Sequence, residues 1–223
     1  MIGVFQNETS ADVLAPEMMR ALSPWSVSAG KRLFDLVLSS VGLLMALPII
    51  ALVSLVLKCS SRDPIYFRQV RVGRDGRQFE LLKFRTMRAL PGAALTQSGD
   101  PRITRIGGFL RRTKLDELPQ LFNVLCGHMS LVGPRPDLPQ FWSTLEGPQR
   151  RILRLRPGLT GHATLLFRDE ERLLASVAQD RLHDYYVSNV LPVKVQMDLD
   201  YAETATLLKD AALIFCTLAR ICR

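Results

Sequence analysis

Residues 36–57 read LVLSSVGLLMALPIIALVSLVL and contain no charged side chain. The apolar run begins at Leu33, and only Asp35 interrupts it. About 20 apolar residues are what a helix needs to cross the hydrocarbon core of a bilayer. The run lies too far from the N-terminus, and is too long, for a simple cleaved signal. It therefore predicts a permanent membrane element.

Positive charge flanks this segment at both ends. The flanking basic residues are Lys31, Arg32, Lys58, Arg62, Arg68, Arg71, Arg74 and Arg77. The positive-inside rule places each end in the cytoplasm, which a single straight span cannot satisfy. Pro48 lacks a backbone N–H and is expected to break the helix near Leu44. These features favour a re-entrant helix–break–helix hairpin over residues 29–58, and one kinked transmembrane span is the alternative.

A second informative stretch is TKLDELPQLFNVL, residues 113–125. Its adjacent acids, Asp116 and Glu117, are expected in the first turn of a helix that ends at Cys126, with Gly127 as its C-cap. Free N–H groups at that end favour an ionised carboxylate or a bound phosphate. Repulsion between the acids tends to raise the pKa of one, which suits a nucleophile beside a proton acceptor. Simple helix capping is the alternative, and an isolated Asp-Glu pair is a cap more often than a catalyst.

Basic side chains gather around this pair in the sequence. Those just upstream are Arg102, Arg105, Arg111, Arg112 and Lys114. Arg135 stands between two prolines, which stiffen the backbone, and arginine suits bidentate phosphate recognition. Lys83 and Arg85 are two residues apart on an expected strand, so they share one face. The dense positive charge predicts an anionic ligand such as a phosphate, and a solvated charged face is the alternative.

The remaining patterns predict an α/β fold that is mostly helical, with a small sheet. A strand over 63–73, a turn at 74–76 and a strand over 79–85 form a hairpin. A loop is expected over 89–100 and a turn over 156–161. Expected helices cover 101–110, 138 or 140 to 154, 169–187 and 201–221, the last amphipathic and able to lie on a membrane. The expected organisation is a lead-in (1–28), a membrane helix (29–58) and a compact cytoplasmic catalytic domain (59–223).

Composition limits the class of partner and of metal site. Lys and Arg number 29 against 21 Asp and Glu, which suits nucleic acid, anionic lipid or phosphorylated substrates. Cys59, Cys126, Cys216 and Cys222 lack zinc-site spacing, so they are expected to be buried or membrane-facing thiols in a reducing compartment. The three histidines, His128, His162 and His183, have no nucleophile at a telling spacing and are interpreted as structural. No nucleic-acid-binding motif appears in the sequence.

Several motifs in series resemble the monotopic phosphoglycosyl transferases, a family of bacterial sugar transferases. The motifs are KRLFD (31–35), RVG (71–73), KFRTM (83–87), PRITRIG (101–107), LDELPQLFNVL (115–125), MSLVGPRP (129–136) and RPGLTG (156–161). They occur in the family's order and spacing over about residues 28–220. A series of this kind is far more specific than any one motif.

The resemblance implies transfer of a phosphosugar from a UDP-sugar to a polyprenol (undecaprenyl) phosphate, giving a polyprenol diphosphosugar and UMP. This is the first membrane step of exopolysaccharide, capsule, O-antigen or glycoprotein glycan synthesis. It implies a bacterial inner-membrane protein whose catalytic domain faces the cytoplasm, in contact with membrane lipid and not with nucleic acid. It also implies Asp116 as nucleophile and Mg²⁺ ligand, and Glu117 as base. The implied phosphate- or substrate-binding residues are Lys83, Arg85, Arg111, Arg112, Arg135 and Arg156.

Three positions depart from the family pattern. Leu47 precedes Pro48 where serine is common, and His128 replaces the usual aspartate before Met129. Residues 161–164 read GHAT where GWAQ is common, which bears on the sugar or nucleotide accepted. The sequence leaves open that sugar, the polysaccharide pathway and the formation of a homodimer.

Two other classes of protein compete with this interpretation. One is a basic membrane scaffold that binds nucleic acid or acidic lipid without chemistry. The other is a polytopic sugar-phosphate transferase, which needs many spans, whereas this sequence has one strong hydrophobic segment.

Overall fold

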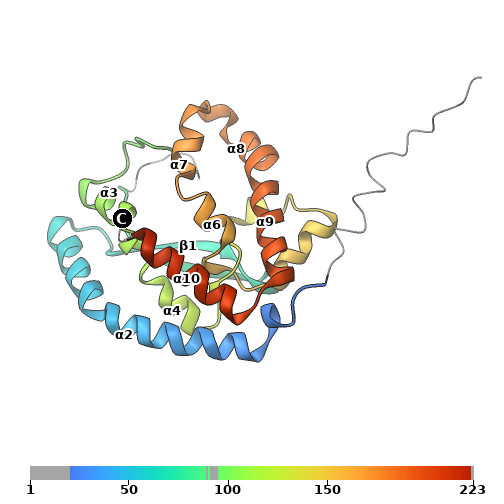
Figure 1. Ribbon diagram of the computed structural model, residues 1–223. Coiled ribbons are helices and arrows are strands. Elements are labelled where there is room, and N and C mark those ends of the chain that lie inside the picture. The colour runs from blue at the N-terminus through green and yellow to red at the C-terminus, as the bar shows by residue number, and fades with distance from the viewer. Residues whose placement is uncertain (1–20, 89, 91–94, 222–223) are drawn as a thin grey trace, which may run out of the picture.

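One long helix and a two-stranded hairpin frame the fold in the computed structural model (Figure 1). The structure describes residues 21–88, 90 and 95–221, so most of the expected lead-in and part of the expected loop over 89–100 lie outside the described residues. The long helix, α2, runs from Ala29 to Ser60. It begins at Ser28, whose hydroxyl accepts a hydrogen bond from the Lys31 N–H at 2.9 Å. This is a standard N-cap, and it satisfies one of the four free N–H groups of the first turn.

The expected break near Leu44 does not interrupt α2, which stays helical through Pro48. The ribbon curves instead, and its C-terminal part turns upward at the left of Figure 1. One face of the helix is buried at intervals of three, four or seven residues, a stripe made by Lys31, Asp35, Ser39, Ala46, Ile50, Val53 and Leu57. By length and composition, α2 is able to cross a membrane. The structure thus confirms a mostly helical chain with one long apolar helix near its start.

The predicted hairpin is confirmed. Strand β1 (Tyr66–Val72) pairs antiparallel with β2 (Gln78–Phe84), in a register that sets Tyr66 opposite Phe84. A 3-10 turn, η3 (Arg74–Gly76), connects the two strands, and Asp75 takes a left-handed conformation (φ 58°) in it. Alternating apolar residues and a turn rich in Asp and Gly therefore located this element correctly.

The turn expected over 156–161 is wrong, because the chain forms a strand there. Strand β4 (Gly158–Thr160) pairs parallel with β3 (Ser130–Val132). A Cβ on Gly158 would lie 2.2 Å from the Gly133 backbone nitrogen, so glycine is needed for close approach of the two segments and not for a turn.

The other helices are shorter than expected and begin at different residues. The helices are α3 (Arg105–Arg112), α4 (Gln120–Leu125), α5 (Pro139–Trp142), α6 (His162–Leu166), α7 (Glu170–Leu173), α8 (Leu182–Tyr185), α9 (Leu191–Thr204) and α10 (Leu207–Ile221). The 3-10 turns, besides η3, are η2 (Trp25–Val27), η4 (Leu115–Glu117), η5 (Gly147–Arg154), η6 (Leu174–Ser176) and η7 (Gln179–Arg181), and η8 (Tyr186–Val190) is a π-helical turn.

Local chemistry explains several of these differences. α3 begins at Arg105 and not at residue 101, because the Thr104 side chain caps it by accepting from the Gly107 N–H at 2.9 Å. The expected helix up to residue 154 is divided into α5 and η5, and the one over 169–187 into five short pieces, the last of which is the start of η8. The expected C-terminal helix is divided between α9 and α10, because Ala205 is extended.

Packing places α4 at the centre of the fold. It lies against α2 on one side and against β2, β3 and β4 on others. α10 contacts β3 and β4, and in Figure 1 it crosses the front of the molecule. Asp210 of α10 is fully buried and accepts from Lys31 Nζ at 2.5 Å and from Trp25 Nε1 at 2.9 Å. This network joins the last helix to the start of α2.

Candidate active site

The sequence predicted the acid pair in the first turn of a helix. The pair lies instead in the 3-10 turn η4, which precedes α4. Lys114 precedes it in a left-handed conformation (φ 56°), which is uncommon for a residue with a Cβ and is found at functional sites. This turn directs both carboxylates inward, where Asp116 and Glu117 are buried. Helix capping does not account for them, because neither side chain caps α4.

Glu117 is the anionic centre of a cluster of basic side chains. Its Oε1 atom accepts from Arg135 Nη2 at 3.2 Å and from Lys83 Nζ at 3.4 Å. Lys114 Nζ lies 3.9 Å from the same oxygen. Burial alone would favour the neutral acid, but these three positive charges together hold the pKa of Glu117 well below its usual range. Glu117 is therefore ionised, and Lys83, Lys114 and Arg135 form a basic shell around it.

Asp116 has the opposite electrostatic character. Its Oδ1 atom is buried and has no hydrogen-bond partner among the described residues. Burial, and then the charge of the adjacent Glu117, raise the pKa of Asp116 to about 6. An unpaired carboxylate oxygen with a raised pKa is more nucleophilic than one held by hydrogen bonds. The two neighbouring acids are thus differentiated by what surrounds them.

A second layer of charge holds the basic shell in place. Burial lowers the pKa of Lys83 to about 8, while the charge of Glu117 raises the pKa of Arg135. Behind Arg135 lie Asp137, which accepts from the Tyr186 hydroxyl at 2.5 Å, and Glu170. Sequence reasoning missed these supporting residues. Asp137 follows Arg135 by two residues and could have been suspected, whereas nothing local points to Tyr186 or Glu170.

The structure does not bring the other predicted phosphate-binding residues to the acid pair by direct contact. Arg85 binds Ser61 and Asp63 after α2, at 2.8 Å and 3.0 Å. Arg111 pairs with Glu171 of α7, although its charge still acts on Asp116. Exposed Arg112 makes no hydrogen bond or ion pair within the described ranges. Arg156 donates from Nε to the Gly127 carbonyl at 3.1 Å, beyond the far end of α4.

A magnesium ion fits the chemistry of this site. The buried, unpaired Oδ1 of Asp116 is the kind of hard oxygen that Mg²⁺ prefers. No three Asp, Glu, His or Cys side chains converge on one point in the described part of the chain. Magnesium commonly binds through one or two carboxylates and completes its shell with water and substrate phosphate oxygens. Asp116 would be such a ligand.

Asn123 fixes the strand that carries Lys83. Its amide nitrogen donates to the Glu80 carbonyl at 2.7 Å, and its amide oxygen accepts from the Leu82 N–H at 3.0 Å. The side chain therefore pairs with the edge of β2 as a neighbouring strand would. This clamp sets where Lys83 lies relative to Glu117.

We expect Asn123→Asp to lower the free energy of unfolding by about 2 kcal/mol, because the carboxylate loses the donor and faces the Glu80 carbonyl. Guanidinium unfolding followed by tryptophan fluorescence measures this. The control is Asn189→Asp, an exposed amide that donates to the Tyr185 carbonyl at 3.1 Å, which should change stability by less than about 0.5 kcal/mol. Equal losses in the two variants would contradict the clamp.

Two of the three histidines, His128 and His183, pack on aromatic rings. His128 stacks on Phe79 and His183 packs on Phe141, which agrees with structural roles. Cys59, Cys126 and Cys216 are free thiols, and all three are exposed and not buried. Cys222 lies outside the described residues.

Comparisons with known proteins identify the family of this chain. The family profile described as bacterial sugar transferase matches residues 26–223. Undecaprenyl-phosphate glucose phosphotransferase of Komagataeibacter xylinus is 40% identical, over 90% of this chain and 37% of the relative. UDP-glucose:undecaprenyl-phosphate glucose-1-phosphate transferase of Escherichia coli K12 is 37% identical, over 84% of this chain and 39% of the relative.

These two relatives are thus much longer than the chain, which spans 37% and 39% of their lengths. A relative of similar length also matches. The exopolysaccharide production protein ExoY of Rhizobium meliloti is 30% identical, over 97% of this chain and 95% of the relative. The profile covers α2, the acid pair and the basic shell together, and the chain belongs to the bacterial sugar transferase family.

Proposed function

We propose that this chain transfers a phosphosugar from a UDP-sugar to undecaprenyl phosphate, releasing UMP. The observation that carries the proposal is the buried, unpaired Asp116 oxygen beside an ionised Glu117 with its basic shell. A carboxylate attacks an anionic phosphate only where positive charge offsets the repulsion. The names of the relatives support the same reaction class and favour glucose as the sugar.

The reaction proceeds in two displacements at one phosphorus atom. An Asp116 oxygen attacks the β-phosphorus of the donor, the bond from that phosphorus to the bridging oxygen breaks, and UMP leaves with the bond electrons. A phosphate oxygen of the polyprenol phosphate then attacks the same phosphorus, and the Asp116 carboxylate is released. Lys83 and Arg135 bind the phosphate oxygens during both displacements.

Glu117 accepts the proton of the incoming polyprenol phosphate. In the free protein its low pKa makes it a weak base, because Lys83 and Arg135 share its Oε1 atom. Substrate phosphates compete for these two cations, and as the cations turn to the phosphates the pKa of Glu117 rises towards its usual value. The site thus gains its base when its substrate is bound. A magnesium ion held by Asp116 would offset negative charge on the diphosphate.

The membrane association that we propose is monotopic, which means that both ends of α2 lie on the same side of the membrane. The buried stripe of α2 runs from Lys31 to Leu57, so both ends of the helix pack on the same globular body. A perpendicular span would draw that body, which carries buried charges, into the hydrocarbon. The outer face of α2 exposes Leu44, Met45 and Leu52.

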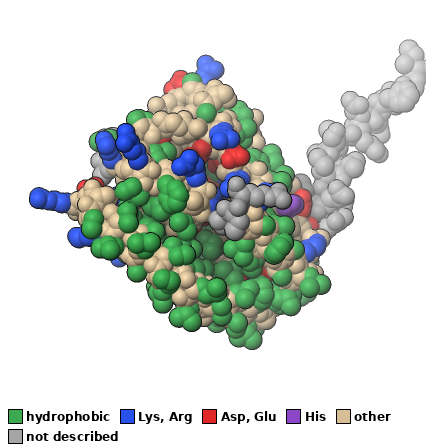
Figure 2. Space-filling model, turned by 60° about the vertical axis from the view of Figure 1, so that its left-hand side comes forward, with side chains coloured by type: hydrophobic (Ala, Val, Ile, Leu, Met, Phe, Trp, Pro, Cys, Tyr) green, Lys and Arg blue, Asp and Glu red, His purple; other side chains and the backbone are tan. Residues whose placement is uncertain are grey.

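A second apolar face belongs to α10, where Leu208 is 79% exposed and Phe215 is 72% exposed. Figure 2 shows hydrophobic side chains spread over the lower part of one face of the molecule, with charged side chains gathered above. We propose that this apolar region rests in the bacterial inner membrane, and that the acid pair opens to the cytoplasm, where UDP-sugars are found. The lipid phosphate and the soluble donor then meet at the membrane surface.

The test is UMP release from a panel of UDP-sugars by the detergent-purified chain with undecaprenyl phosphate and Mg²⁺. We expect release with at least one sugar, UDP-glucose first among them. Folded protein that releases no UMP from any donor, yet binds acidic lipid or nucleic acid, would contradict the enzyme and favour the scaffold.

The pH dependence of kcat/KM for UMP release should be bell-shaped. Asp116 must lose its proton, so activity rises through about pH 6, and Lys83 must keep its own, so activity falls above about pH 8. In Lys83→Arg the guanidinium stays charged, so the alkaline limb should move upward while the acid limb stays. An alkaline limb that is unchanged in Lys83→Arg would rule out this assignment.

A further inference from the structure

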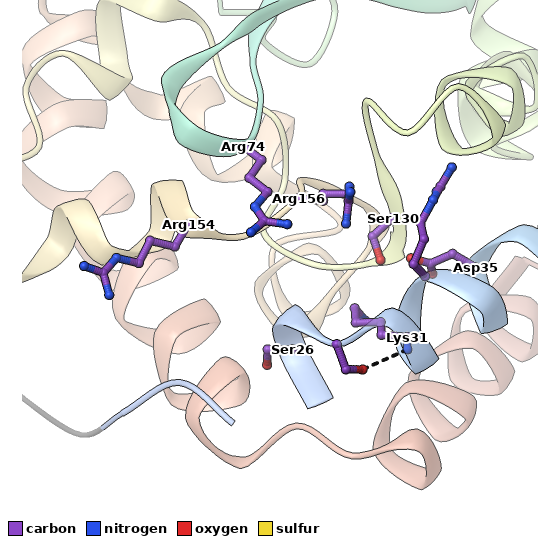
Figure 3. A pocket seen from close by; sticks show the side chains of 9 residues that line it. Ser26, Lys31, Asp35, Arg74, Ser130, Arg154 and Arg156 are labelled. Carbon is purple, nitrogen blue, oxygen red and sulfur yellow. Dashed lines mark hydrogen bonds between the residues drawn. The ribbon is translucent and has the colours of Figure 1, made fainter. Parts of the chain in front are cut away.

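A second cationic pocket lies near the start of α2 (Figure 3). Its enclosed part holds about one water molecule and the rest opens to solvent, so a phosphate would lie at its mouth. The residues that line it are Ser26, Ser28, Lys31, Arg32, Asp35, Arg74, Ser130, Arg154 and Arg156. Five of them are basic, Lys31 and four arginines, and Asp35 is the acid among them. Asp75, which does not line the pocket, adds a second negative charge beside Arg74. These residues come from η2, α2, the β1–β2 turn, β3 and the segment that enters β4, so the pocket is a product of the fold.

Three of these arginines are close enough to repel one another. Arg32 donates to the carbonyls of Val124 and Leu125 at 2.7 Å and 2.9 Å, and Arg156 donates to the nearby carbonyl of Gly127 at 3.1 Å. In Figure 3, Arg74 reaches from the β1–β2 turn towards Arg156, whereas Arg154 points away from it. Burial, and then the charges of Arg74 and Arg32, lower the pKa of Arg156.

Arg74 is the member of the group with spare hydrogen-bonding capacity. Its Nε atom makes no hydrogen bond within the described ranges and forms only a long ion pair, 3.6 Å, with Oδ2 of the exposed Asp75. Crowded guanidinium groups in a partly enclosed site raise the free energy of the folded chain unless an anion lies among them. A tetrahedral phosphate, with several acceptor oxygens, satisfies more than one guanidinium at once.

This pocket is separate from the acid pair. Asp116 and Glu117 precede α4, whereas Arg32 and Arg156 bind carbonyls at its other end. The six residues of α4 alone extend over about 9 Å. A phosphate in the pocket would therefore not be the one that reacts.

We propose that Arg32, Arg74 and Arg156 form a second, non-catalytic phosphate-binding site. The chemistry fits two sources of phosphate, the head group of an anionic membrane lipid and a soluble phosphate. The lipid source is available because the pocket lies just before Leu33, where the exposed apolar face of α2 begins. The site goes beyond the transfer reaction and does not depend on it.

The test compares Arg74→Gln with a matched variant, Arg77→Gln. Both change an arginine of the β1–β2 connection to the same neutral side chain, but Arg77 is exposed and does not line the pocket. The Arg74 side chain makes no hydrogen bond to the backbone in the described residues, so Arg74→Gln should leave the fold intact. Melting temperatures of the variants check this. One arm titrates the full chain in neutral detergent with inorganic phosphate, followed by calorimetry. The other arm uses native mass spectrometry to count phosphatidylglycerol retained from nanodiscs, with phosphatidylcholine as the neutral reference.

Arg74→Gln should weaken phosphate or phosphatidylglycerol binding about tenfold, while Arg77→Gln stays within about twofold of the unaltered chain. Repeating both arms on Arg135→Gln separates the two sites, because that change weakens the shell of Glu117 and should leave pocket binding in place. A loss confined to phosphatidylglycerol identifies a lipid head group, and a loss of inorganic phosphate identifies a soluble source. Equal binding by Arg74→Gln and Arg77→Gln in both arms, or binding abolished by Arg135→Gln alone, would overturn the proposal.

Discussion

Asp116→Asn should abolish UMP release, with a fall of at least about a thousandfold, and should also make the folded chain more stable. Asparagine has the size of aspartate but lacks the nucleophilic oxygen. Stability rises because burial and Glu117 raise the pKa of Asp116 above its unfolded value. Such a group favours folding only while it is protonated, so its ionisation costs stability as the pH rises from about 4 through about 6. Removing it should contribute about 1–3 kcal/mol near pH 7.5 and little near pH 4.

Urea unfolding at these two pH values measures the stability, and UMP release measures the activity. Asp180→Asn is the matched control, because that carboxylate is exposed, and it should change neither quantity. An inactive Asp116→Asn that is also less stable than the unaltered chain would mean that the carboxylate has structural partners, contrary to its unpaired Oδ1 atom.

Glu117→Gln should have the opposite effect on stability and lower the free energy of unfolding by about 3 kcal/mol. Glutamine keeps the shape but leaves Lys83 and Arg135 without their anion. The deficit should shrink as the pH rises, because burial lowers the pKa of Lys83 and the charge of Glu117, which opposes that shift, is gone from the variant, so the amine can lose its charge. Activity should also fall, since the base is lost.

Glu80→Gln is the control for this change. Glu80 pairs with Arg68 at 3.5 Å on the exposed hairpin, and such surface pairs contribute about 0.5 kcal/mol or less. Added pyrophosphate should partly restore the stability of Glu117→Gln, because it supplies the missing negative charge. If Glu117→Gln and Glu80→Gln lose equal stability, the basic shell is satisfied by water and not by Glu117.

The fold follows from the sequence wherever a pattern is long or a turn is strongly marked. The 22 uncharged residues from Leu36 to Leu57 identify α2, and alternation around Arg74–Gly76 identifies the hairpin. The three-residue strand β4 escapes such reasoning. Its Pro-Gly signal indicates a turn, and only the partner strand reveals that Gly158 serves close packing against Gly133. Pro48 misleads in a similar way, because α2 bends at low cost where its outer face has no neighbour.

The site is harder to derive, because its contacts are distant in sequence. The motif suggests Asp116 and Glu117 as reactive acids, and composition suggests basic partners. Which cation meets which acid depends on the packing of β2 and the Arg135 loop around η4, so Lys83 and Arg135 reach Glu117. Arg111 pairs with Glu171, which lies 60 residues further along the sequence, and no local pattern indicates that pairing. The difference between the two acids, one paired and one unpaired, appears only in three dimensions.

The most direct test of the two-step account is intact-protein mass spectrometry after mixing with UDP-glucose and Mg²⁺, in the absence of polyprenol phosphate. The account predicts one equivalent of UMP and a chain heavier by one hexose phosphate. Peptide mapping should place the adduct on Asp116, and polyprenol phosphate should remove it. UMP release that requires the acceptor from the start, with no adduct on a rapidly quenched chain, would contradict Asp116 as a covalent nucleophile. That result would assign the reaction to direct transfer between the two substrates.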